Sequence, residues 1–391
     1  MSTGSSSRGL ALYLGVVQFF FATTWTIYVL YLPQLAAQAG IDKRWVPWIL
    51  VADQAVFAVM DVVTGFWIDR VRKSLARYGE WILGVSVASC VAFVFLPFVG
   101  STLMLLLLAV WAVTSSALRS PPWALLGRYA ATPALPWLSA LVLTGSALAA
   151  AAAPYLGLSL RGVSPALPFV LSTATLVATV AGLIVVERRL PAAPVSESGN
   201  PQISEPKVLF FAALLLFALG FQIHFSINSA PQYLRVAQGS DLPWLMPVFW
   251  IGFNVVMFPA AALASRLGML RTMALAGAVG ALAALAAAFA GSLPSMLAAQ
   301  FVAGGAWGAA NVAAYSAAIA FGRTGREGRF LGTLFAMLAL AAFARIAAVA
   351  SGYATDPALK SLLPWLPQTA WLLAALLLIC GLRPARALRP A

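Results

Sequence analysis

The sequence predicts an all-α membrane protein, with twelve transmembrane helices arranged as two pseudo-symmetric six-helix halves. Three observations predict this class. Of the 391 residues, 62% are hydrophobic and only 9% are charged, whereas a soluble domain carries about 25% charged residues. The apolar residues form twelve runs, each near the roughly 20 residues that a helix needs to cross a bilayer. One long polar segment divides these runs into six and six.

The predicted spans are joined by short connections, with that one exception. Residues 187–207 (ERRLPAAPVSESGNPQISEPK) are polar and contain Pro and Ser, which is typical of a flexible linker. We therefore expect an N-terminal six-helix bundle over residues 1–186, a cytoplasmic linker at 187–207 and a C-terminal six-helix bundle over 208–391. The spans are predicted at residues 9–36, 45–67, 81–99, 103–126, 135–156, 166–186, 208–230, 244–263, 273–290, 296–321, 330–350 and 362–382.

The basic residues predict the orientation in the membrane, because loops rich in Lys and Arg stay in the cytoplasm. With the N-terminus inside, 17 of the 24 Lys and Arg residues lie on the cytoplasmic side, five lie in outer loops, and Arg119 and Arg345 lie within spans. This spread of the +13 net charge through short loops indicates contact with membrane lipid and not with nucleic acid. We expect a monomeric, multi-pass protein of the plasma (inner) membrane with both termini cytoplasmic.

The segments that follow the second and the eighth span resemble each other. The first contains Asp69-Arg70, and the second contains Ser265-Arg266 at the matching place. Internal repeats are typical of secondary transporters, whose substrate site lies near the middle of the membrane between the repeats. The motif G-x-x-x-x-G-K-[ST] is absent from the sequence, so we expect a gradient, and not ATP, to drive transport.

Reactive side chains are few and scattered. Cys90 and Cys380 lie in separate apolar runs, and His224 is the single histidine. This pattern provides neither the ligand spacing of a metal site nor a nucleophile beside a base. We therefore expect no enzyme activity, no metal and no cofactor.

Several motifs carry a resemblance to known transporters. The twelve spans and the loop Gly65-Phe-Trp-Ile-Asp69-Arg70-Val-Arg72-Lys73 resemble the major facilitator superfamily. A narrower similarity is to the glycoside–pentoside–hexuronide cation symporters, the family of the melibiose permease. Three stretches carry this similarity. The first is Asp61-Val-Val-Thr-Gly65, followed by Asp69-Arg70 and by Tyr78-Gly79-Glu80-Trp81-Ile82-Leu83. The second is Pro121-Pro122-Trp123-Ala124-Leu125, and the third is Thr324-Gly325-Arg326-Glu327-Gly328. The resemblance implies alternating access along a path lined by the first, fourth, seventh and tenth spans.

The sequence departs from the symporter pattern at the positions that would bind the cation. Phe57 replaces the acid one turn before Asp61, and Arg119 takes the place of an acid in the fourth span. Of the cation-site acids of that family, only Asp61 is present. Because sodium needs several oxygen ligands, this pattern favours coupling to protons over coupling to sodium.

Charged residues inside spans are costly and point to function or to pairing. Asp61 and Arg119 each lie 16 residues after the start of a span that runs inward, so both are expected at the same depth. Either Arg119 binds an anionic substrate group that Asp61 releases on protonation, or the two form a permanent bridge. Asp53 is either a protonatable coupling residue or faces a water-filled vestibule. Arg345 is either a second anion contact or snorkels to the interface.

Polar and aromatic side chains within the spans are candidates for the lining of the path. His224 and Asn228 are one turn apart and are expected to share a face, where they either line the cavity or bond to other helices. The remaining candidates are Gln18, Trp25, Tyr28, Asn311 and Tyr315.

The loop after the second span is a candidate gating latch. Asp69 is expected to meet the N-terminus of the eleventh span, where the helix dipole stabilises a negative charge. The predicted latch residues are Gly65, Asp69, Arg70, Arg72 and Glu327.

These observations predict a secondary active transporter that moves a small organic solute by alternating access. The arginines favour an anionic or zwitterionic substrate, with a proton, or else sodium, as the coupling ion. The alternatives are an efflux pump for amphipathic compounds, a sugar/cation symporter, and a receptor or assembly factor that does not transport.

Overall fold

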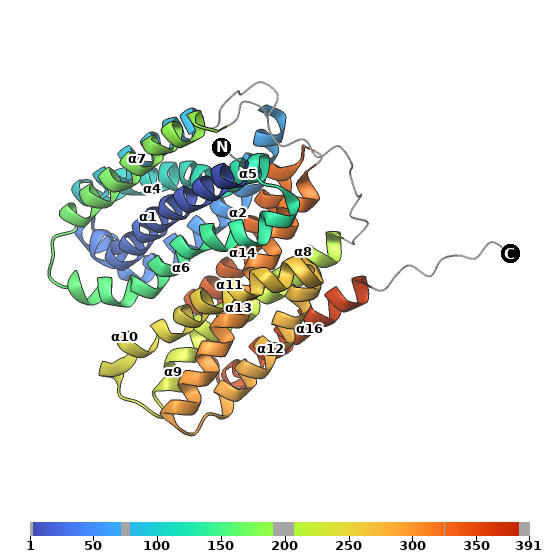
Figure 1. Cartoon of the computed structure of the whole chain (residues 1–391). Coiled ribbons are helices and arrows are strands. Elements are labelled where there is room, and N and C mark those ends of the chain that lie inside the picture. The colour runs from blue at the N-terminus through green and yellow to red at the C-terminus, as the bar shows by residue number, and fades with distance from the viewer. Residues whose placement is uncertain (1–2, 72–78, 191–206, 324, 383–391) are drawn as a thin grey trace.

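The computed structural model describes residues 3–71, 79–190, 207–323 and 325–382, and in these ranges every regular element is a helix. Helices occupy all twelve predicted spans, so the predicted all-α fold with twelve spans is confirmed (Figure 1). Of the predicted linker at 187–207, residues 191–206 lie outside the described ranges.

The N-terminal half contains α1 (Thr3–Gln38), α2 (Val46–Val71), α3 (Gly79–Phe95), α4 (Ser101–Ser115), α5 (Ser120–Tyr129), α6 (Leu135–Ser159) and α7 (Ala166–Arg188). The C-terminal half contains α8 (Lys207–Ile223), α9 (Ser229–Tyr233), α10 (Leu242–Leu245), α11 (Pro247–Leu267), α12 (Met269–Phe289), α13 (Leu293–Gly322), α14 (Glu327–Ala350), α15 (Pro357–Leu362) and α16 (Leu366–Gly381).

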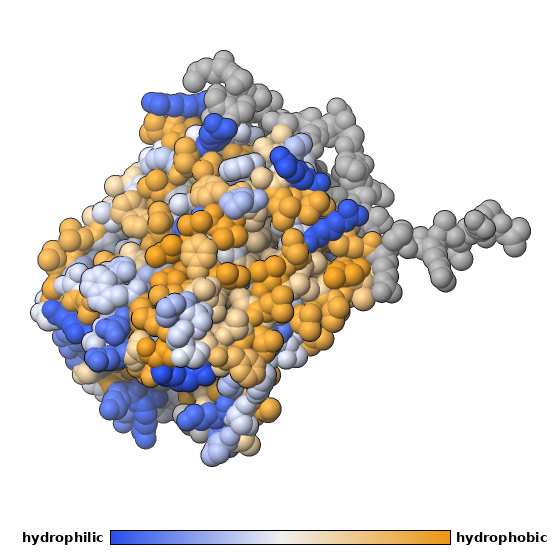
Figure 2. Space-filling model, turned by 60° about the horizontal axis from the view of Figure 1, so that its bottom comes forward, coloured by the Kyte–Doolittle hydropathy of each residue, from blue (hydrophilic) through white to orange (hydrophobic). Residues whose placement is uncertain are grey.

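Ten spans of the described chain are long and apolar enough to cross a bilayer by length and composition alone. The other two predicted spans are α16, a shorter apolar helix, and α13. Helix α13 is rich in Ala and Gly, and nearly all of its residues from Ala303 to Gly322 are buried. Such a helix packs against protein and not against lipid, so its low hydropathy is no obstacle. Figure 2 shows apolar residues over most of the face in view and hydrophilic residues gathered toward its ends.

The fourth predicted span is not one continuous helix. Helix α4 ends at Ser115, a 3-10 turn covers Ser116–Leu118, and α5 begins after Arg119. Pro121 and Pro122 lack the N–H groups that would continue the helix, and the N–H missing at Pro122 would have bonded the Leu118 carbonyl. That carbonyl accepts a hydrogen bond from Gln18 Nε2 of α1 at 2.9 Å instead. Arg119 therefore lies at a helix break (φ −94°, ψ −85°).

The two halves meet mainly through two helix pairs, α2 with α14 and α6 with α11, and α6 also contacts α13 while α5 contacts α14. Between α2 and α14 the backbones touch because the facing residues are glycines. A Cβ atom at Gly65 would collide with the Gly328 carbonyl, and a Cβ atom at Gly332 would collide with the Asp61 carbonyl. Small residues of this kind let helices approach closely where lipid offers no hydrophobic drive.

This close contact makes Gly65→Ala a sensitive test of the packing. The added methyl group overlaps backbone that has no rotamer with which to yield, and such overpacking costs about 1–3 kcal/mol. We expect a lower melting temperature for the purified variant. Gly84→Ala in α3 is the matched control, because a Cβ atom there meets nothing within 4 Å; equal melting temperatures for the two variants would contradict the packing described.

Candidate functional site

A cavity of about 430 Å³ lies between the two halves, within the range of small-molecule sites. Its walls come from α1, α2 and α6 on one side and from α8, α13 and α14 on the other. On α2 the lining runs from Leu50 to Phe57, and on α14 it runs from Phe335 to Ile346. The cavity therefore extends from the middle of the bundle toward the end opposite the two termini.

An ion pair forms the deep wall of this central cavity. Arg119 Nε lies 3.0 Å from Asp61 Oδ2. The Asp61 side chain is fully buried, whereas that of Arg119 is 16% exposed and lines the cavity. The Arg119 guanidinium also lies over the rings of Phe57 and Phe335, at 4.9 and 5.2 Å from their centroids. These contacts hold the guanidinium between α2 and α14 while part of it faces the cavity.

The Asp61 carboxylate is held by its ion pair with Arg119. In the described part of the chain, neither of its oxygens has a hydrogen-bond donor apart from Arg119. A buried carboxylate without other donors depends on its counter-charge, since removing one partner of a buried pair leaves an uncompensated charge.

The second buried acid, Asp53, has a partner of its own. Tyr28 donates a hydrogen bond from its hydroxyl to Asp53 Oδ2 at 2.5 Å, and both side chains are buried. Tyr28 packs against Trp111, on which Trp25 also stacks with 5.5 Å between ring centroids. Of these residues only Trp25 lines the cavity, so Asp53 and Tyr28 lie behind an aromatic wall.

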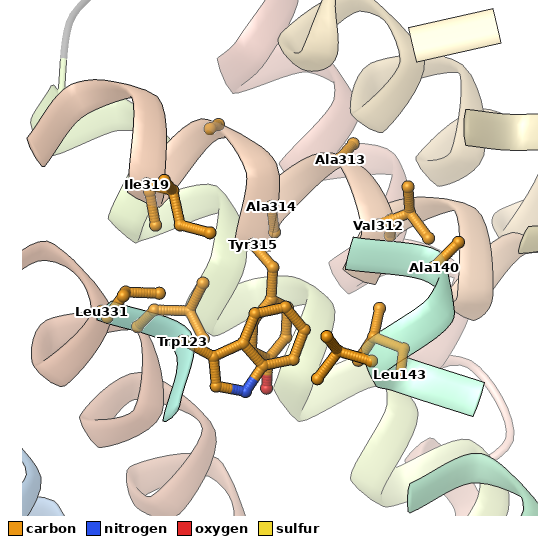
Figure 3. Close-up of a cluster of buried hydrophobic side chains, with 14 of the residues drawn as sticks. Trp123, Ala140, Leu143, Val312, Ala313, Ala314, Tyr315, Ile319 and Leu331 are labelled. Carbon is orange, nitrogen blue, oxygen red and sulfur yellow. The ribbon is translucent and has the colours of Figure 1, made fainter. Parts of the chain in front are cut away.

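Aromatic side chains close the cavity toward the end that carries the termini. Tyr315 of α13 lines the cavity, and its ring lies 4.2 Å from that of Trp123 in α5 (Figure 3). Phe335 of α14 packs edge-on against Tyr315 at 5.4 Å. Three helices from both halves thus contribute to one aromatic layer beneath the cavity.

Arg345 of α14 lines the cavity nearer its other end, where Arg345 Nε donates a hydrogen bond to Gln222 Oε1 at 3.0 Å. The same two residues line a second space of about 320 Å³. We call this space the outer groove. Its other lining residues are Leu219, Ile223, Ile227, Ala344, Ala348, Tyr353, Ala354, Leu359, Leu362, Leu363 and Leu366.

Like Tyr28, three further predicted lining residues do not line the cavity. His224 bonds Gln300 at 3.2 Å, Asn228 donates to the Leu363 carbonyl at 2.8 Å, and Asn311 donates to the Trp307 carbonyl at 2.8 Å. His224 and Asn228 thus bond to other segments of the C-terminal half, which is the alternative to lining the cavity that the sequence left open, and a π-helix covers residues 224–228.

The cavity also contains residues that were not among the predicted lining residues. Gln54 and Ser146 contribute polar groups there, beside Gln222, which lies close to His224 on the same predicted span. Phe57 and Phe335 contribute rings. A sequence feature that could have predicted the polar residues is a single amide or hydroxyl side chain within an apolar run. The rings carry no such signal, because aromatic residues are common throughout the spans.

Three of the predicted latch residues, Gly65, Asp69 and Glu327, lie where α2 meets the start of α14. Asp69 Oδ1 accepts a hydrogen bond from the Gly328 N–H at 2.8 Å, and Asp69 Oδ2 accepts from the backbone and side chain of Arg329, both at 3.1 Å. A carboxylate at a helix N-terminus satisfies free N–H groups and the helix dipole together. Glu327, the first residue of α14, is buried.

Gly65 is buried against α14. Of the two other predicted latch residues, Arg70 is exposed and Arg72 lies outside the described residues.

A cavity between two pseudo-symmetric helical halves, sealed at one end, is the architecture of a secondary transporter. A family model described as the Major Facilitator Superfamily matches residues 14–346. The chain belongs to this superfamily, whose members are transporters and not enzymes. A search of the curated proteins gave no match.

The fold is similar to that of solved transporters. The human organic anion transporter MFSD10 (TETRAN) has a TM-score of 0.69 at 15% identity, over 96% of this chain and 98% of that one. A bacterial homologue of the iron transporter ferroportin, in an outward-facing state, has a TM-score of 0.70 at 16% identity, over 95% and 99%. FucP, the E. coli fucose:proton symporter, has a TM-score of 0.69 in its outward conformation at 13% identity, over 96% and 99%. At these identities the similarity shows the fold alone.

The contacts of Asp69 predict the effect of Asp69→Asn. The amide replaces one accepting oxygen by a donor that faces N–H groups, and hydrogen bonds to a charged group contribute about 1.5–3 kcal/mol. We expect the protein to fold and insert but to turn over about tenfold or more slowly in reconstituted vesicles. Glu80→Gln, which neutralises an exposed carboxylate at the start of α3, is the control; normal turnover of Asp69→Asn would rule out the latch.

The ion pair predicts a coupling between Arg119→Ala and Asp61→Ala. Arg119→Ala leaves a buried acid unpaired and should lower the melting temperature, whereas the double variant should recover much of the loss. Residues in direct contact usually show interaction energies of about 0.5–3 kcal/mol. Melting temperatures of the wild type, both single variants and the double variant measure this coupling. Purely additive effects would show that the two charges do not stabilise each other.

Proposed function

We propose that this protein is a proton-coupled secondary transporter of a small organic anion, working by alternating access. The observation that carries the proposal is the position of Arg119. Its guanidinium reaches the cavity, while its only acidic partner in the described chain, Asp61, is fully buried behind it. Arginine presents a charged, planar fork of donors that matches a carboxylate, sulfonate or phosphate group.

The pair provides a mechanism for coupling. When Asp61 is ionised, it neutralises Arg119, and an anion from the cavity must compete with it. When Asp61 takes up a proton, the positive charge of Arg119 is free for the anion. Anion binding and protonation of Asp61 therefore favour each other, and this linkage is reciprocal. The anion and the proton then cross together.

Protons fit the site better than sodium. Sodium needs a cage of several oxygen ligands, but the two acids near the cavity already have partners: Asp61 faces Arg119, and Asp53 accepts from Tyr28. A proton needs no such cage, and a single acid such as Asp61 is enough to bind it.

The proposal includes an orientation and a gate. We place both termini in the cytoplasm of a plasma (inner) membrane protein, because 17 of the 24 Lys and Arg residues then lie on the cytoplasmic side. Residues 1–186 and 208–391 act as the two moving halves of a monomer, joined by the linker at 187–207. Asp69, bound to the start of α14, locks the halves in a state closed to the cytoplasm.

Among the proteins that share this fold, one is described as an organic anion transporter and another as a fucose:proton symporter. Sugar transport with a cation, the activity of the melibiose permease family, is less well supported because Arg119 stands in place of an acid. Export of amphipathic compounds is the second candidate, favoured by the aromatic wall around Trp25 and by the apolar outer groove.

The test is uptake into vesicles, with hexanesulfonate as probe because a sulfonate stays ionised and does not cross lipid as a neutral acid. We expect an inward proton gradient to drive uptake without sodium. Binding to the purified protein should strengthen as pH falls, by at most about tenfold per pH unit for one coupled proton.

Two variants show which acid takes up the coupled proton. Asp61→Asn should bind hexanesulfonate at all pH values alike and lose proton-driven uptake, whereas Asp53→Asn should keep both pH dependences. The proposal fails if uptake strictly requires sodium. The assignment to Asp61 fails if Asp53→Asn, and not Asp61→Asn, abolishes the pH dependence.

A further inference from the structure

The central cavity and the outer groove are divided by two polar residues. Arg345 and Gln222 line both spaces, and they are joined by the 3.0 Å hydrogen bond from Arg345 Nε to Gln222 Oε1. Every other residue of the groove is apolar apart from the hydroxyl of Tyr353. A polar cavity and an apolar groove thus meet at one guanidinium.

Arg345 carries a positive charge that no acid of the described chain neutralises. Its one hydrogen bond goes to a neutral amide, and none of the ion pairs found in the described ranges includes it. Arg345 is partly exposed and lines both spaces, so its guanidinium is accessible from them. A charge of this kind within a span needs an anionic partner, and the accessible space beside it is where that partner binds.

The position of Arg345 on α14 directs the partner inward. Arg345 lies five residues before the end of α14 at Ala350, about 8 Å along the axis. Side chains on a helix lean toward its N-terminus, and for Arg345 this direction is toward the middle of the bundle. The charged group of a ligand held there lies in the cavity, while the groove extends beside it between α8, α14 and α15.

We propose that the transported solute is an amphipathic anion, whose charged group binds Arg345 in the central cavity and whose apolar part occupies the outer groove. This inference rests on the proposed function, because Arg345 faces the same cavity as Arg119. The groove takes the tail of one solute and not a membrane phospholipid: its volume of about 320 Å³ is that of a single small-molecule site. A charged group bound to Arg345 also lies in the cavity, whereas the headgroup of a phospholipid stays at the membrane–water interface.

The experiment measures how affinity depends on chain length. The probes are straight-chain sulfonates of two, four, six and eight carbons, with octanol as the neutral control. Binding is measured on the full chain in nanodiscs of phosphatidylcholine, with protein-free nanodiscs subtracted. We expect affinity to rise up to about fourfold per methylene group, as for transfer of a methylene group out of water. Arg345→Gln should weaken all four sulfonates, and octanol should not compete.

Two variants fill the groove from α14 without altering the arginines. Ala348→Trp and the more exposed Ala344→Trp should bring the affinity ratio of octanesulfonate to ethanesulfonate close to one. Val349→Trp is the matched control, because Val349 is adjacent, is 48% exposed and lines neither space. For Val349→Trp, the affinity ratio of octanesulfonate to ethanesulfonate should equal that of the wild type. Two groove variants are used so that the test still works if one of them fails to fold.

The outcomes separate this inference from the proposed function. If the sulfonates bind in an Arg119-dependent manner but without dependence on chain length, the groove proposal is wrong and the anion transporter stands. The groove proposal is also wrong if Ala348→Trp and Ala344→Trp keep the wild-type ratio while losing co-purified phospholipid, because the groove would then hold lipid. If no sulfonate binds at any length, the proposed function fails as well.

Discussion

Arg119 and Asp61 place two opposite charges at a depth where lipid provides no solvation, and much of the site depends on how the chain brings them together. The proline pair at 121 and 122 breaks the fourth span, so Arg119 leaves the helix at the cavity wall. On the other side, the backbone of Asp61 touches α14, where Gly332 leaves no room for a side chain. A charge pair of this kind tolerates the loss of neither partner. The binding of a third charge in the cavity must therefore change the protonation or the position of the pair.

The same helix links the pair to the seal at the end that carries the termini. Asp69 lies eight residues after Asp61 on α2, about 12 Å along the axis, and holds the first N–H groups of α14. Between them, Gly65 packs on the backbone of α14. A change at Asp61 that loosens α2 from α14 therefore acts on the ion pair and on the latch through one continuous contact. Alternating access requires such a connection between the substrate site and the gate.

At the other end of the cavity, Arg345 has no acidic partner in the described chain, and in the mechanism that we propose this asymmetry gives the path a direction. An anion that first meets Arg345 finds an accessible charge, whereas Arg119 becomes available only when Asp61 is protonated. The apolar outer groove beside Arg345 then adds selectivity for solutes with an apolar part. Two arginines with different partners thus provide successive anion contacts along one cavity.

Much of this architecture could be predicted from residue patterns, because a bilayer imposes length and polarity on every span. Counting residues from the start of each span predicted that Asp61 and Arg119 lie at the same depth, and the structure contains a 3.0 Å ion pair between them. Hydropathy does not register backbone geometry, however. The break at Arg119 and the π-helix at His224–Asn228 were therefore missed. The outer groove depends on how α8, α14 and α15 lie together, which a single sequence does not specify.

The central claim is that an anion at Arg119 and a proton on Asp61 bind together. Infrared difference spectroscopy on the purified protein, with and without hexanesulfonate, tests this most directly because a protonated carboxyl group has its own stretching band. The account predicts that anion binding produces this band in the wild type and in Asp53→Asn, but not in Asp61→Asn. Anion binding to the wild type without the band, or a band that persists in Asp61→Asn, would contradict it.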